Sequence, residues 1–86
     1  MRVLVVYKQE SDHAREVFDY LNDFERQTGK TIEEIDPDTR DGAQFCRVYD
    51  VVEYPSILAL SDDGVLQHFW RGRPLPTMSE VSYYVQ

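Results

Sequence analysis

Cysteine is nearly absent from this chain. Cys46 is the single cysteine, so no disulfide can form within the chain. A protein without disulfides suits a reducing compartment, and we expect a cytoplasmic location. Long apolar runs are also missing, because the N-terminal run covers only residues 3–7 and a charged stretch follows it. That run is too short for a signal-peptide core or a membrane span, so neither is expected.

Basic residues are few as well. Nine Lys and Arg residues stand against sixteen Asp and Glu residues, which gives a net charge of −7. Nucleic acids and anionic membranes bind basic surfaces, so neither is expected as a partner. The two histidines and the cysteine do not fall at metal-ligand spacing. The sequence therefore predicts no metal site and no cofactor.

The first half of the chain alternates between strand and helix patterns. Residues 3–7 are apolar and β-branched, as in a strand buried on both faces. Ser11 offers an N-cap for a helix that Gly29 would end, and residues 30–36 form a weaker strand pattern. The apolar residues of this helix recur at helical spacing and are expected to face the sheet: Ala14, Val17, Phe18, Leu21 and Phe24.

A second helix and a central strand follow. Asp38 or Thr39 can cap the helix, which has Ala43, Cys46 and Tyr49 on one face. Asp50 can take the left-handed conformation at its end. The stretch from Tyr54-Pro55 into residues 56–60 predicts a buried strand, because proline opens a strand rather than sitting inside one.

The last part of the chain predicts a hairpin and a third helix. Residues 62–64, with the sequence Asp-Asp-Gly, are typical of a tight turn, and a return strand is expected over residues 65–71. Thr77 and Glu80 fit a capping box at the start of the last helix. The predicted order is β-α-β-α-β-β-α in one domain, residues 1–86. This is an α/β fold with a four-stranded mixed sheet flanked by helices.

Four features of the sequence resemble the thioredoxin and glutaredoxin family. Asp36 ends the second strand, and residues 49–56 resemble the family's segment that leads through a proline into the central strand. Asp63-Gly64 resembles its hairpin turn, and Gly72 resembles the glycine after its last strand. The resemblance implies a thioredoxin-like fold and a cis peptide bond before Pro55.

The resemblance does not extend to the family's active site. Where the family has Cys-x-x-Cys, this chain has Ser11-Asp12-His13-Ala14. Thiol–disulfide exchange needs a thiolate and a second thiol, which serine and alanine do not supply. Lys8 lies three residues before Ser11, where many glutaredoxins have a lysine that contacts glutathione. The stretch Arg71-Gly72-Arg73-Pro74 lacks the family's glutathione signature, so glutathione is not expected to bind.

These residues predict a redox-inactive binding or adaptor module. A peptide-docking groove is expected around Ser11, His13, Tyr54 and Pro55, because the family pairs extended peptides with the backbone beside its proline. Ser11 and His13 do not face each other on a helix, so no hydrolase is predicted. Two alternatives stay open. Cys46 could serve a single-cysteine redox or glutathione-linked function, and the chain could act as a homodimer or as a subunit of a larger complex.

Overall fold

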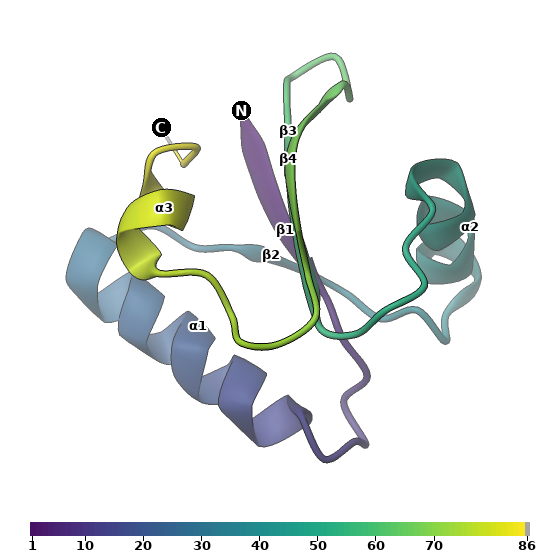
Figure 1. The fold of residues 1–86 in the computed structure, drawn as a ribbon, viewed down its shortest axis with the longest axis horizontal. Helices are drawn as coiled ribbons and strands as arrows, with labels where there is room; N and C mark the ends of the chain where they lie inside the picture. The colour runs from purple at the N-terminus through teal and green to yellow at the C-terminus, as the bar shows by residue number, and fades with distance from the viewer. Residues whose placement is uncertain (86) are drawn as a thin grey trace.

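Seven secondary-structure elements make up the computed structural model, which describes residues 1–85 (Figure 1). Their order, β-α-β-α-β-β-α, confirms the sequence prediction. The bounds are β1 Arg2–Val6, α1 Ala14–Thr28, β2 Glu33–Ile35, α2 Arg40–Tyr49, β3 Ser56–Leu60, β4 Leu66–Arg71 and α3 Met78–Ser82.

The four strands form one mixed sheet in the order β2-β1-β3-β4. β1 and β2 are parallel, whereas β3 is antiparallel to both β1 and β4. Val6 lies opposite Ser56 at the end of the β1–β3 ladder. The chain therefore leaves β1 and enters β3 at the same end of the sheet.

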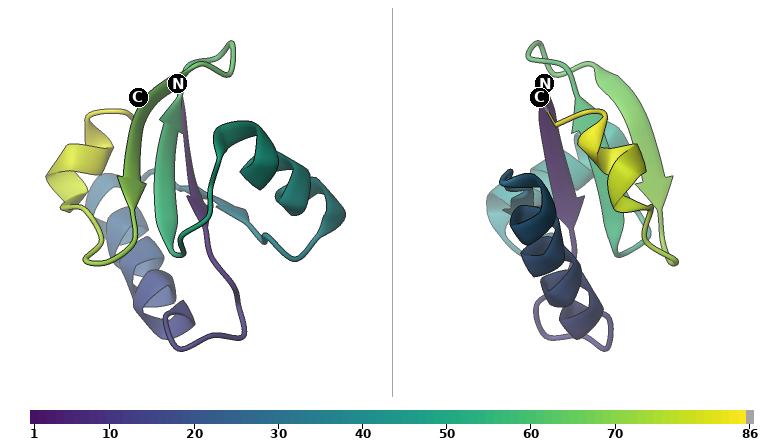
Figure 2. Two further views of the ribbon diagram at one scale, coloured as in Figure 1. Left: turned by 45° about the vertical axis from the view of Figure 1, so that its right-hand side comes forward. Right: turned by 90° about the vertical axis from the view of Figure 1, so that its left-hand side faces the viewer.

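Helices cover both faces of the sheet. α1 and α3 lie on one side, and α2 lies on the other (Figures 1 and 2). Each face has its own core because side chains alternate along the strands. Val5 and Ile57 pack on the α1 side, while Leu4, Leu58 and Cys46 pack on the α2 side.

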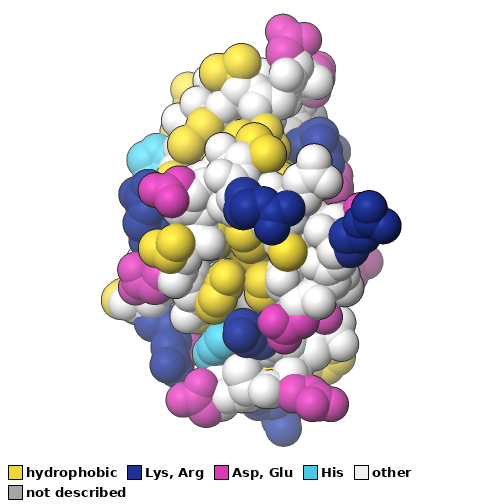
Figure 3. All heavy atoms as spheres, turned by 90° about the vertical axis from the view of Figure 1, so that its right-hand side faces the viewer, with side chains coloured by type: hydrophobic (Ala, Val, Ile, Leu, Met, Phe, Trp, Pro, Cys, Tyr) yellow, Lys and Arg dark blue, Asp and Glu magenta, His cyan; other side chains and the backbone are white. Residues whose placement is uncertain are grey.

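The α2 layer covers its face incompletely. Hydrophobic side chains remain visible in the middle of this side of the molecule, with Lys and Arg side chains around them (Figure 3). Val48 and Val52 are exposed, and Phe45, Tyr49 and Phe69 are only partly buried. Cys46 lies beneath them with 8% of its surface exposed.

The helix ends agree with the sequence signals at α2 and α3. Thr39 caps α2 by accepting a hydrogen bond from the backbone N–H of Gly42, and Asp50 ends it at φ 57°. Gly42 is required because a Cβ there would lie 1.8 Å from the backbone oxygen of Asp36. Thr77 and Glu80 form the predicted capping box of α3.

Two predictions about α1 are wrong. Ser11 is not its N-cap, because the helix begins at Ala14 after His13, and no side chain caps it. The Ser11 hydroxyl instead donates to the carbonyl of Lys8 at 2.5 Å. Phe18 was expected in the core but is 57% exposed, whereas Val17 and Phe24 are fully buried.

Phe18 lies over the edge strand β2, where its neighbour on the α1 face of the sheet is the charged residue Glu34. The prediction gave this strand residues 30–36, but only Glu33–Ile35 pair with β1. The sheet is therefore short at this edge. The part of α1 that carries Phe18 looks over an open hollow, which is described below.

Candidate functional site

Two loops meet at the end of β1 and β3. The chain runs on from Val6 to Tyr7 and Lys8, and it reaches Ser56 through Tyr54 and Pro55. The Lys8 ammonium lies 5.6 Å from the centre of the Tyr54 ring, within range of a cation–π contact. The fold thus brings the Tyr54-Pro55 step beside the loop that precedes Ser11. The Tyr54–Pro55 peptide bond is cis.

Ser11 and Ala14 close a turn between this loop and α1. The backbone N–H of Ala14 donates to the carbonyl of Ser11 at 3.3 Å. Ser11 is partly buried, and its hydroxyl also bonds within the loop, to Lys8. The hydroxyl therefore braces the loop.

His13 is buried, with 7% of its surface exposed. Its Nε2 accepts a hydrogen bond from the backbone N–H of Lys8 at 3.2 Å, so this nitrogen carries no proton. Its ring also meets the Tyr7 ring edge to face, with 6.5 Å between the centroids. His13 holds the loop in place from beneath, and its ring offers a peptide little surface.

Tyr54 presents the polar feature of this site. Its backbone N–H and C=O have no hydrogen-bond partner among residues 1–85. The backbone groups on either side of Tyr54 are not free in this way. The Glu53 carbonyl accepts a hydrogen bond from the Ser56 hydroxyl at 2.5 Å, and Pro55 has no N–H. Tyr54 as a whole residue is half-buried.

The Tyr54 side chain reaches Cys46 on α2. Burial raises the pKa of the Cys46 thiol, and a hydrogen bond with Tyr54 opposes this in part. Burial also raises the pKa of the Tyr54 hydroxyl, and the neighbouring thiol adds to the effect. Both groups are therefore held in their protonated forms, and the thiolate of Cys46 is disfavoured.

A third segment, residues 71–73, borders the same place. Arg73 lies 3.9 Å from the carboxylate of Asp12. Gly72 takes a positive φ of 69°, and a Cβ on it would lie 2.0 Å from the Glu53 carboxylate. None of Asp12, Glu53 and Arg73 was predicted at the site. Glu53 directly precedes Tyr54 in the sequence, which could have indicated it, whereas the contact of Asp12 with Arg73 joins two distant loops.

The Lys8 side chain makes two contacts within the protein. Besides the Tyr54 ring, its ammonium lies 3.6 Å from the Asp38 carboxylate. The resemblance of Lys8 to the lysine that contacts glutathione in many glutaredoxins stays a weak prediction. Among the residues that the structure describes, no group of three His, Cys, Asp or Glu side chains could hold a metal ion. Within the same residues, no helix is both long and apolar enough to cross a membrane.

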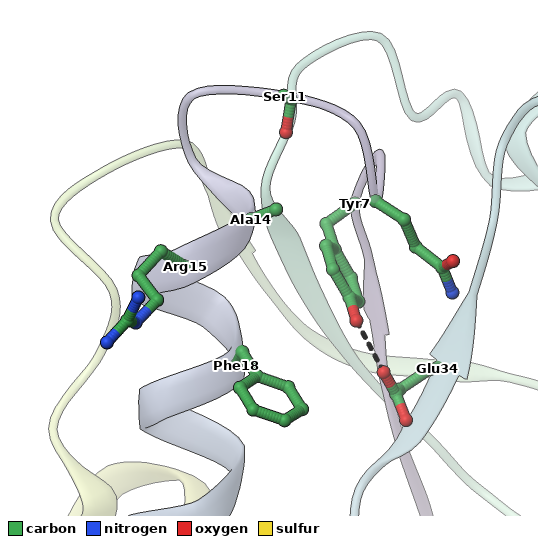
Figure 4. A pocket seen from close by; sticks show the side chains of 7 residues that line it. Tyr7, Ser11, Ala14, Arg15, Phe18 and Glu34 are labelled. Atoms are coloured by element: carbon green, nitrogen blue, oxygen red, sulfur yellow. Dashed lines mark hydrogen bonds between the residues drawn. The ribbon is translucent and has the colours of Figure 1, made fainter.

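A separate hollow of about 550 Å³ lies on the other side of the Ser11 turn, between α1 and β2 (Figure 4). Tyr7 and Glu34 form one wall, and the hydroxyl of Tyr7 donates to the Glu34 carboxylate at 2.5 Å. Burial, followed by this hydrogen bond, raises the pKa of Tyr7 to about 12. This hollow was not predicted from the sequence. Its lining residues are Tyr7, Gln9, Ser11, Ala14, Arg15, Phe18 and Glu34.

Comparison with known proteins supports the fold alone. No family model and no curated protein matches the chain. The structure is similar to that of thioredoxin 1 from the thermophilic eubacterium Thermosipho africanus TCF52B, with a TM-score of 0.67. The match covers 99% of this chain and 90% of that chain at 13% sequence identity. The chain therefore has the thioredoxin fold, as its sequence predicts.

Proposed function

We propose that this protein is a binding module that holds an extended peptide against the backbone of Tyr54, without thiol–disulfide exchange. The observation that carries the proposal is the backbone N–H and C=O of Tyr54, two residues before β3, which have no hydrogen-bond partner among residues 1–85. A free donor and acceptor on one residue at the end of a strand is the arrangement that an extended peptide completes by strand addition. The groove would include Ser11, His13, Tyr54 and Pro55, with His13 as a buried support.

Charged side chains at the rim of the groove would help to orient the bound peptide. Lys8 and Arg73 bring positive charge, and Asp12, Asp38 and Glu53 bring negative charge. Because the charges are mixed, the rim favours no peptide of one sign. Affinity would come chiefly from main-chain hydrogen bonds, which accept many sequences.

The lack of redox chemistry follows from the residues present. Ser11 precedes α1 and Ala14 is its first residue, and neither supplies a sulfur. The single thiol, Cys46, is buried, and burial raises its pKa. A thiol of this kind is a poor nucleophile, so no observation favours the single-cysteine alternative.

Peptide backbone pairing can be tested with N-methylated peptides. A peptide selected from a phage-displayed library is prepared as a series, each member with one amide N-methylated. If one amide donates to the Tyr54 carbonyl, its methylation should weaken binding about tenfold. Methylation of the adjacent amides, which point to the other side of an extended chain, should change binding little.

Titration of the ¹⁵N-labelled protein with these peptides decides the proposal. In spectra of the ¹⁵N-labelled protein, the largest shifts are expected at Tyr54, Ser56 and Ser11. A peptide that binds elsewhere, or whose binding depends on no single amide, would contradict backbone pairing. For the redox part, the protein should not speed the reduction of insulin by dithiothreitol. Activity that is lost in Cys46→Ser would overturn that part.

A further inference from the structure

The hollow between α1 and β2 is built from aromatic rings and one carboxylate. Figure 4 shows the Phe18 ring directed from α1 toward the Tyr7–Glu34 pair on the strands. Phe18 is 57% exposed, which is unusual for a phenylalanine on the sheet side of a helix. A ligand that covers this ring would remove apolar surface from water, which favours binding.

The unpaired charge inside the hollow is negative. The Glu34 carboxylate accepts the Tyr7 hydroxyl through Oε1, and Oε2 has no partner among residues 1–85. Arg15 also lines the hollow, but its guanidinium points away from Glu34 in Figure 4 and lies 3.6 Å from Asp19. An incoming cation would therefore meet a free carboxylate oxygen beside two aromatic rings.

The hollow continues along α1 into a smaller one of about 140 Å³. The two share Phe18 and Glu34, and the smaller one adds the apolar side chains of Leu21 and Ile32 and the carboxylate of Glu25. An occupant with an apolar stem and a cationic head fits this combination. Its stem would lie on Phe18 and Leu21, while its head would reach Glu34.

We propose that this hollow binds an arginine side chain, with the guanidinium on Glu34 and the aliphatic stem against Phe18. A guanidinium suits the site better than an ammonium for two reasons. It is planar and stacks on aromatic rings, and its several N–H donors can serve both the carboxylate oxygen and the side chain of Gln9. It also pairs with carboxylates through charge-assisted hydrogen bonds. The overall charge of −7 would add a weak attraction for any basic partner.

The experiment is a titration of the ¹⁵N-labelled protein with Nα-acetyl-arginine-N-methylamide, which presents the side chain as a peptide would. We expect millimolar binding with amide shifts at Tyr7, Phe18 and Glu34. Glu34→Gln keeps an acceptor for the Tyr7 hydroxyl but removes the charge, and it should weaken binding about tenfold. Phe18→Leu keeps an apolar side chain but removes the ring, and it should weaken binding about threefold.

The matched control is Glu16→Gln, which removes the same charge from α1 at an exposed residue that does not line the hollow. It should leave binding unchanged. Equal losses in Glu16→Gln and Glu34→Gln would overturn the proposal, because the attraction would then be non-specific. Equal binding of the blocked norleucine analogue, which has no charge, would also overturn it.

Free arginine tests whether the hollow recognises only the side chain or also the α-amino and carboxylate groups. It should bind as well as the blocked arginine, because the site uses only the side chain. Binding of free arginine alone would mean that the α-amino and carboxylate groups are recognised, which contradicts the proposal. Ser11 borders both places, but Tyr54 does not line this hollow, so shifts at Phe18 and Glu34 without a shift at Tyr54 distinguish this site from the backbone pairing proposed above.

Discussion

The two sides of the Ser11 turn differ in the groups that they offer to a ligand. On the Tyr54 side, His13, Lys8 and Arg73 have contacts within the protein, and the Tyr54 backbone N–H and C=O have no hydrogen-bond partner among residues 1–85. On the β2 side, what remains free is a hollow with an exposed ring and a carboxylate. A free backbone accepts many peptide sequences, whereas a hollow of this kind selects one side chain. One turn would therefore border both proposed sites, which would differ in selectivity.

The largest expected change is the gain of a disulfide at the turn that separates the two sides. The Ala14 N–H to Ser11 C=O bond of 3.3 Å closes a four-residue turn, whose end Cα atoms lie within about 7 Å of each other. This is close to the separation that a disulfide spans. The double variant Ser11→Cys/Ala14→Cys should form an intrachain disulfide and accelerate insulin reduction by dithiothreitol.

Thiol titration of the denatured variant measures the outcome. After mild oxidation only Cys46 should react, and reduction should expose the new pair. Ser11→Cys alone is the control, and it should show no intrachain bond and no turnover. If the double variant keeps all its thiols free under oxidation, the turn does not have the geometry described here.

The next largest effect is a difference in stability between substitutions on the buried face of α1 and on the part of α1 that faces the hollow. Phe24 is fully buried, so Phe24→Ala should lower the free energy of unfolding by about 3–5 kcal/mol. Phe18 lies on the open side at 57% exposure, so Phe18→Ala should change it by less than about 1 kcal/mol. Urea unfolding of both variants measures this difference. Similar losses in the two variants would mean that Phe18 belongs to the core after all.

A smaller effect comes from the hydroxyl that Tyr7 donates to Glu34 in the wall of the hollow. Tyr7→Phe should cost about 1 kcal/mol at neutral pH. The pKa of Tyr7 is raised from 10.0 to about 12, chiefly by burial. The protonated Tyr7 hydroxyl therefore makes its full contribution to the free energy of unfolding below pH 10.0, and this contribution is lost as the pH rises through about 12.

Alkaline unfolding at several pH values tests this dependence. The pKa of Tyr20 is also raised to about 12 by burial, so Tyr20→Phe serves as a parallel variant. Each single variant should lose stability less steeply than the parent between pH 10.0 and about 12. A Tyr7→Phe curve parallel to that of the parent would contradict the environment assigned to Tyr7.

The smallest effect is expected at Lys8, on the Tyr54 side. Its contacts with the Tyr54 ring and Asp38 are near the surface, so Lys8→Met should change the free energy of unfolding by about 0.5 kcal/mol or less. Thermal unfolding at low and high salt measures it. A loss well above 1 kcal/mol would mean that Lys8 holds the loop together.

The sequence predicted the fold well because its signals are local. A proline before an apolar run, a Thr-x-x-Glu box and Asp-Gly at a turn each fix a boundary through backbone chemistry. The resemblance to thioredoxins then indicated a thioredoxin-like fold for this order of elements. The errors at Ser11 and Phe18 arose where local pattern is not enough. The Ser11 hydroxyl bonds to the Lys8 carbonyl instead of capping the helix, and Phe18 meets the charged Glu34 where an apolar partner would have covered it.

The candidate sites were predicted less completely. Tyr54, Pro55 and Ser11 were identified through the resemblance, and the structure brings their loops together. The hollow at Glu34 was missed, because Tyr7 and Glu34 are 27 residues apart and meet only through the parallel pairing of β1 and β2. Asp12 and Arg73 were missed for the same reason, since their contact joins two distant loops.

Amide hydrogen exchange at Tyr54 tests the central claim most directly. With no hydrogen-bond partner among residues 1–85, this amide should exchange rapidly in the free protein, while the amides of β3 exchange slowly. In complex with a selected peptide it should become protected, since strand addition gives it an acceptor. A Tyr54 amide that is already protected in the free protein, or that stays unprotected in the complex, would contradict the account.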